Sequence, residues 1–146
     1  MRLLFVVSSL FLLILFSAPS FAHKYETSVG VGHQYGGLLG VKVAYKSAQT
    51  KYYGALGLVG VSVGMQTTFS KGSKHTYGFT LGREELQSED GFLFVTYDYH
   101  FNGFQQEGFV IGTGLGITRE DDGGFLADKG DIETSTSATL TLAYKF

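Results

Sequence analysis

The sequence has four histidines, whose side chains can act as acid, base or metal ligand. One of them, His100, follows the carboxylate of Asp98 by two positions. Asp98 and His100 occupy alternate positions of a Thr-Tyr-Asp-Tyr-His segment. If this segment is a strand, both side chains face the same side. A histidine in that setting can act as general base for a serine nucleophile in acyl transfer. No serine neighbours the pair in the sequence, so the competing interpretation is a hydrogen-bonded network of enclosed polar side chains.

Patterns that bind metals or nucleotides do not occur at the required spacing. The sequence has no cysteine, and His23, His33 and His75 lack the spacing of a zinc motif such as His-Glu-x-x-His. The glycine cluster at 112–116 lacks the Gly-Lys-Ser/Thr that opens a phosphate-binding helix. The acidic segment at 121–131 does not follow the spacing of an EF-hand. We therefore expect no cofactor and no metal site.

The composition favours strands and tight turns. Of the 146 residues, 21 are Gly and only 1 is Pro, and the aromatic residues are 9 Tyr and 13 Phe. The length suits one domain. The formal net charge of -2 provides no basic excess, so we expect no nucleic-acid partner.

Residues 1–22 have the organisation of a secretory signal peptide. Arg2 precedes an apolar run at 3–16, and Ser20-Phe21-Ala22 fits the small-x-small rule for cleavage. The alternative is an N-terminal transmembrane anchor, which needs about 20 apolar residues, and Pro19 interrupts the run before that length. We expect cleavage after Ala22, which leaves residues 23–146 as the folded domain.

From His23 onward the hydrophobic pattern has a period of two, which is typical of strands with two different faces. Large apolar residues occupy one face, and the other face is mostly Gly, Thr, Ser and charged residues, most clearly at 38–46, 74–86, 92–101, 109–120 and 138–146. A soluble β-sandwich, the alternative, needs an inner face that fills a core. We therefore predict an all-β fold, an antiparallel up-and-down transmembrane β-barrel with its apolar side chains toward lipid.

Turn signals separate the expected strands at 36–37, 47–50, 70–73, 87–91, 102–108 and 121–131. Residues 51–69 keep one parity from Tyr53 to Phe69. They could form a single strand, which gives seven strands, or six if residues 26–46 also run through their turn signal. Single-chain bacterial barrels have an even number of strands, from eight upward. We therefore expect eight strands and place a further turn at 57–61.

The aromatic residues support this arrangement. If both termini face the periplasm, the large aromatic side chains gather at the periplasmic end, where a girdle at the lipid headgroups is expected. They are Tyr25, Tyr45, Tyr53, Phe69, Tyr97, Tyr99, Phe101, Phe109, Tyr144 and Phe146.

The C-terminal segment resembles the terminal targeting strand of bacterial outer-membrane barrels. The final Phe146 follows Leu140, Leu142 and Tyr144 on alternate positions. Together with the leader and the length of the remaining chain, this makes the sequence similar to the small OmpA/OmpX-like barrels of Gram-negative bacteria. The resemblance implies an eight-stranded barrel in the cell outer membrane that is assembled by the barrel-assembly machinery and contacts lipid and lipopolysaccharide. It implies no activity.

Charged and polar residues on the inward face form the candidate polar network of the lumen: Lys42, Glu84, Asp98, His100 and Lys145. A narrow lumen requires such groups to pair or to be solvated. We expect a structural or surface-interaction barrel without catalysis. The alternatives are a narrow porin-like channel for ions or small solutes and a lipid-modifying barrel enzyme that uses His100.

Overall fold

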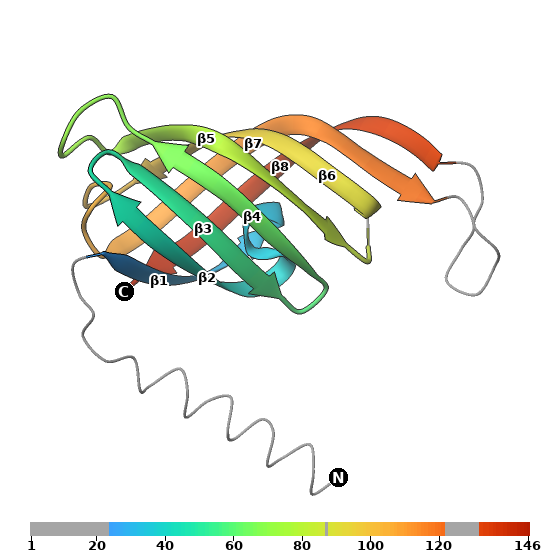
Figure 1. Ribbon diagram of the computed structural model, residues 1–146, viewed down its shortest axis with the longest axis horizontal. Coiled ribbons are helices and arrows are strands. Elements are labelled where there is room, and N and C mark those ends of the chain that lie inside the picture. The colour runs from blue at the N-terminus through green and yellow to red at the C-terminus, as the bar shows by residue number, and fades with distance from the viewer. Residues whose placement is uncertain (1–23, 87, 122–131) are drawn as a thin grey trace, which may run out of the picture.

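The chain folds into one closed barrel of antiparallel strands. The computed structural model describes residues 24–86, 88–121 and 132–146, and in them each strand is hydrogen-bonded to the next while β8 returns to β1 (Figure 1). The strands are β1 (Tyr25–Gly32), β2 (Gly37–Ser47), β3 (Thr50–Gly57), β4 (Gly60–Thr67), β5 (His75–Glu84), β6 (Ser88–His100), β7 (Gly108–Asp121) and β8 (Ile132–Lys145). The predicted all-β, eight-stranded up-and-down barrel is confirmed. The expected leader, with its cleavage after Ala22, lies outside the described residues.

The weakest predicted boundary, at 57–61, is a tight turn between β3 and β4. Leu56 pairs with Val61 across this turn. Residues that pair directly across antiparallel strands face the same side, so the outward positions change from even to odd numbers here. The predicted place of Tyr53 in the outer aromatic girdle is therefore wrong, because odd-numbered residues of β3 face inward. Leu56 is exposed, whereas Tyr53 is buried and does not belong to an outer girdle.

The turn predicted at 87–91 is shorter than expected, because β6 begins at Ser88. Glu84 pairs with Ser88, and Gly91 already pairs with Arg119 of β7. Gly91 has a φ of 115°, a conformation that glycine adopts without strain. The wall is therefore taller on this side of the barrel, where β7 and β8 have 14 residues each against 8 in β1.

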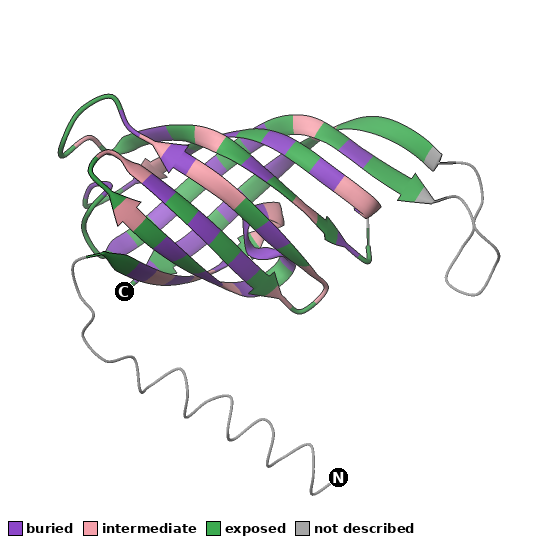
Figure 2. Ribbon diagram, viewed as in Figure 1, coloured by how far each residue is buried: buried purple, intermediate pink, exposed green. Residues whose placement is uncertain are grey.

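The barrel has a polar interior and an apolar exterior. Buried and exposed residues alternate along the strands (Figure 2). Among the described residues, 19 polar or charged residues are buried but only 9 hydrophobic ones, and every strand has large hydrophobic residues that remain exposed. This inverts the usual distribution of a globular protein, whose interior is mainly apolar.

A short helical segment folds into the interior from one end. We call the end where β1 begins and β8 finishes the terminal end, and the opposite one the far end. The 3-10 helix η1 (His33–Tyr35) follows β1 at the far end and lies inside the barrel (Figure 1), with Gln34 and Tyr35 buried. Gly40 makes room for it, since a Cβ at that position would collide with the carbonyl oxygen of Tyr35.

The β6–β7 turn at 101–107 folds into the interior from the terminal end. The side chain of Phe104, in the middle of this turn, is fully buried.

Within the described ranges, no helix has the length and apolar character needed to cross a membrane.

Candidate functional site

Gln34 of η1 is the centre of a hydrogen-bonded cluster inside the barrel. Its amide nitrogen donates to Oδ1 of Asp98 at 2.8 Å, and Nζ of Lys42 donates to its amide oxygen at 3.3 Å. Gln66 donates to Oδ2 of Asp98 at 2.8 Å. Both oxygens of this buried carboxylate therefore have partners, as a charged group removed from water requires. These bonds fix η1 inside the barrel.

Two aromatic rings complete the surroundings of Lys42. Its Nζ lies 4.3 Å from the ring centroid of Tyr35 and 4.4 Å from that of Tyr53, within the range of a cation–π contact. The hydroxyl of Tyr35 is hydrogen-bonded to Ser28 at 3.0 Å. Sequence reasoning missed the contact with Tyr53 because it assigned that residue to the outer face.

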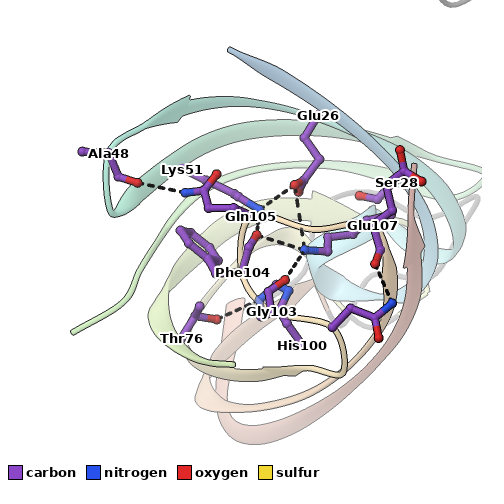
Figure 3. A network of polar contacts seen from close by, with 12 residues as sticks. Glu26, Ser28, Ala48, Lys51, Thr76, His100, Gly103, Phe104, Gln105 and Glu107 are labelled. Atoms are coloured by element: carbon purple, nitrogen blue, oxygen red, sulfur yellow. Dashed lines mark hydrogen bonds and ion pairs between the residues drawn. The ribbon is translucent and has the colours of Figure 1, made fainter. Parts of the chain in front are cut away.

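A second cluster fills the terminal end of the barrel (Figure 3). Nζ of Lys51 lies 2.6 Å from Oε2 of Glu26 and also donates to the carbonyl oxygen of Phe104. Nζ of Lys145 donates to the carbonyl oxygens of Gly103 and Phe104 at 3.1 and 3.0 Å, and lies 3.9 Å from Oε2 of Glu26. Two ammonium groups thus hold the β6–β7 turn in the interior through its backbone.

His100 belongs to this second cluster. Its Nε2 lies 3.2 Å from Oγ1 of Thr76, and its ring meets that of Phe104 edge-on with the centroids 5.4 Å apart (Figure 3). The carboxylate of Asp98 is bound by the two glutamines of the first cluster. The carboxylate of Asp98 and the ring of His100 therefore have separate partners, although both side chains face the interior as the sequence indicated.

A third cluster lies at the far end, where β1 and β8 stop pairing. Nδ1 of His33 lies 2.9 Å from Oγ1 of Thr139, and Nε2 of the same ring lies 3.3 Å from Oε1 of Glu84. Hydroxyl, imidazole and carboxylate in this order are the groups of a hydrolase triad. Only the threonine contact has hydrogen-bond alignment, because Nε2 of His33 has no hydrogen-bond partner in the described part of the chain. The arrangement supplies polar groups for binding rather than an aligned proton relay.

These three side chains lie on the wall of a pocket of about 270 Å³, which we call the seam pocket. Its other described lining residues are apolar or small: Val31, Gly32, Gly37, Leu38, Leu86, Ala138 and Leu140. The volume is close to the lower limit of small-molecule sites.

The sequence pattern predicted only part of this third cluster. It assigned Glu84 to the inward face but grouped it with Lys42 and Asp98, whereas the structure places Glu84 beside His33. The alternation in β8 also indicates that Thr139 faces inward. It does not indicate the position of His33, because this residue lies after the end of β1, in the 3-10 helix η1.

The four residues of the C-terminal pattern lie on the outer surface of the barrel, three of them in β8 and Phe146 directly after it. Leu140, Leu142, Tyr144 and Phe146 are all exposed to the outside of the barrel. The ring of Tyr144 packs edge-on against Phe109 and Phe146, with centroids 5.1 and 5.2 Å apart.

No family model, curated protein or solved structure matches this chain. Within the residues that the structure describes, no three His, Cys, Asp or Glu side chains are grouped so as to hold a metal ion. No match therefore assigns a role to any of the three clusters.

Proposed function

We propose that this protein is a barrel of the bacterial outer membrane with a filled lumen and a structural or surface-interaction role at the cell surface. The exterior of the barrel carries the proposal. Every strand presents large apolar side chains outward while polar side chains are buried inside. A lipid bilayer favours such an exterior. It also requires a closed sheet, because backbone groups in hydrocarbon need hydrogen-bond partners within the protein.

The apolar exterior has the boundaries of a membrane band. Outward aromatic residues gather toward the terminal end, as at a headgroup interface: Tyr25, Tyr45, Tyr52, Phe69, Tyr77, Tyr97, Phe101, Phe109, Tyr144 and Phe146. Toward the far end, exposed Arg83 and Arg119 follow the last outward apolar residues of their strands, Leu81 and Ile117. Arginines at this level are suited to pair with the phosphates of lipopolysaccharide.

From the level of Arg119, with which Thr134 pairs, the barrel wall becomes a polar extension on β8. In β8 the segment 133–137 is Glu-Thr-Ser-Thr-Ser, and its residues are exposed or half-buried whichever way they face. Polar side chains on both faces of a strand suit water on both sides. In the proposed orientation this extension stands outside the membrane and is the surface available to a partner.

The interior supports a filled lumen rather than a porin-like one. Gln34 and Tyr35 of η1 occupy it from the far end, and Phe104 occupies it from the terminal end. An eight-stranded barrel is narrow enough for side chains to fill.

Two features of the sequence support export and insertion. Residues 1–22 have the pattern of a cleavable leader. The alternating apolar residues that end at Phe146 resemble the strand that the barrel-assembly machinery reads. They lie exposed along one outer surface, where such a reader would reach them.

Cysteine labelling on intact cells tests this proposal, since the sequence has no cysteine of its own. Ser135→Cys lies in the polar extension, and Ser70→Cys lies in the β4–β5 connection at the terminal end. A membrane-impermeant maleimide should label Ser135→Cys on intact cells and Ser70→Cys only after the outer membrane is permeabilised. Labelling of Ser70→Cys alone would reverse the orientation, and labelling of neither variant before lysis would contradict a surface location.

A further inference from the structure

The seam between β1 and β8 is incomplete toward the far end. The four backbone pairs between these strands end at Val31 and Leu142. β8 continues to Ile132 and, among the described strands, pairs there only with β7. Within the described part of the chain, one edge of β8 therefore has no strand beside it beyond Leu142, and the seam pocket lies at this edge.

The seam pocket is lined from both faces of the barrel wall. Thr139 is buried on the inner face, whereas its neighbour Leu140 is among the most exposed hydrophobic residues of the outer face. Both line the pocket. The gap beside β8 thus joins the apolar exterior to the polar cluster of His33, Glu84 and Thr139.

We infer that the seam pocket binds a neutral amphiphile, a molecule with an aliphatic chain and a head group that carries a hydroxyl. The pocket holds the junction between the head group and the chain. The exposed side chains of Val31, Leu38 and Leu140 would receive the chain, because apolar surface that they cover is removed from water. The pocket is too small for a whole lipid, so the rest of the chain lies along the outer face of the barrel.

Glu84 determines which head group is accepted. It is the one formally charged residue among the described residues that line the pocket. A carboxylate or phosphate would be repelled by it, whereas a hydroxyl donates a charge-assisted hydrogen bond to it. The same hydroxyl can accept from Nε2 of His33, a buried nitrogen for which the described residues provide no hydrogen-bond partner. Thr139 then donates to Nδ1, which fixes the tautomer of the ring.

The source of the amphiphile rests on the proposed function. Leu140 belongs to the apolar exterior, and Ser137, three residues away, belongs to the polar extension. The pocket therefore lies at the level where the heads and chains of the outer leaflet would meet. Binding itself does not depend on that location and can be measured with the isolated barrel.

Tryptophan fluorescence tests this inference, because the sequence contains no tryptophan. Leu38→Trp places one fluorophore at the rim of the pocket, and Leu93→Trp places one on the exposed face of β6 as the matched control. Each full-length variant is refolded in a phosphocholine detergent and titrated with monododecanoylglycerol brominated near its ester. Brominated dodecanoate, the anionic counterpart, is titrated in parallel. Gel mobility before and after boiling verifies that each variant is folded.

The glycerol ester should quench Leu38→Trp saturably, at least about tenfold more tightly than dodecanoate, while Leu93→Trp should follow only the bromine content of the micelle. Glu84→Gln and Thr139→Val, each in the Leu38→Trp background, should weaken binding roughly tenfold, as loss of a hydrogen bond to a charged or buried group does. Glu133→Gln, exposed on β8 and outside the pocket, should leave binding unchanged.

Equal quenching of the two tryptophans would overturn the inference. So would equal affinity for the anion, or unchanged binding in both Glu84→Gln and Thr139→Val. Such results would leave the outer-membrane proposal intact, because the titration uses purified protein in micelles. Failure of the cell-surface labelling would likewise leave the binding result intact.

Discussion

Nδ1 of His33 lies 2.9 Å from Oγ1 of Thr139, and this hydrogen bond joins residues that are 106 positions apart in the chain. The bond lies just beyond the last backbone pair of β1 with β8. The two side chains therefore continue a closure that the backbone leaves incomplete. Because four backbone pairs already close the seam nearer the terminal end, this side-chain bond matters more to the pocket than to the barrel.

The closure of the barrel predicts a disulfide between its first and last strands. Val29 pairs with Tyr144, and directly paired residues of antiparallel strands have the Cα separation that a disulfide needs. Val29→Cys/Tyr144→Cys should oxidise to an intramolecular disulfide, seen as a gel shift that a reductant reverses.

The control for this disulfide is Val29→Cys/Leu93→Cys, whose second site lies on β6, a strand that does not pair with β1. This control should remain reduced under the same oxidation. An open sheet, in which β1 and β8 do not meet, would leave both double variants reduced.

Removal of the Lys51 ammonium should destabilise the terminal end strongly. Lys51 is fully buried, and its Nζ lies 2.6 Å from the carboxylate of Glu26. Lys51→Met leaves a buried carboxylate with a poorer partner, so we expect a loss of about 3 kcal/mol in the free energy of unfolding. Urea unfolding of the refolded barrel in lipid vesicles measures this loss.

Two further variants separate the ion pair from general packing. Glu26→Gln/Lys51→Met removes both charges and should recover most of the stability lost in the single variant. Lys71→Met, in the exposed β4–β5 connection, should behave as wild type. If Lys51→Met unfolds at the same urea concentration as Lys71→Met, the buried ion pair does not stabilise the terminal end.

Asp98 should be needed to keep η1 inside the barrel. Asp98→Ala removes the acceptor for Gln34 and Gln66, so we expect a loss of about 2 kcal/mol from unpaired buried donors. Hydrogen exchange should accelerate at the amide of Gly36, which donates to the carbonyl of His33 within this segment. Glu107→Gln, on an exposed residue, is the control. Unchanged exchange at Gly36 in Asp98→Ala would show that η1 is held by other contacts.

The alternation of the sequence predicted the faces of most strands, because in a strand the side-chain direction follows residue number alone. It assigned the outward residues of β8 and the inward direction of Lys42, Asp98 and Lys145 as the structure has them. It failed for Tyr53, since a tight turn between β3 and β4 reverses parity and Leu-Val is a weak turn signal.

Alternation gives the face of a residue but not which interior residues meet. Lys42 and Asp98 are hydrogen-bonded to the same side chain, that of Gln34, a residue of η1 that is 64 positions from Asp98. Glu84 is inward as well, yet its partner is His33 at the far end. These contacts depend on the two segments that fold into the lumen, for which local sequence has no periodic signal.

Gel mobility of the protein in isolated outer membranes, with and without boiling, tests the central claim most directly. A closed barrel resists detergent until it is heated. We predict that the protein fractionates with the outer membrane and that its unboiled band migrates differently from its boiled band. Recovery in the soluble periplasmic fraction, with the same mobility before and after boiling, would contradict a membrane-embedded barrel.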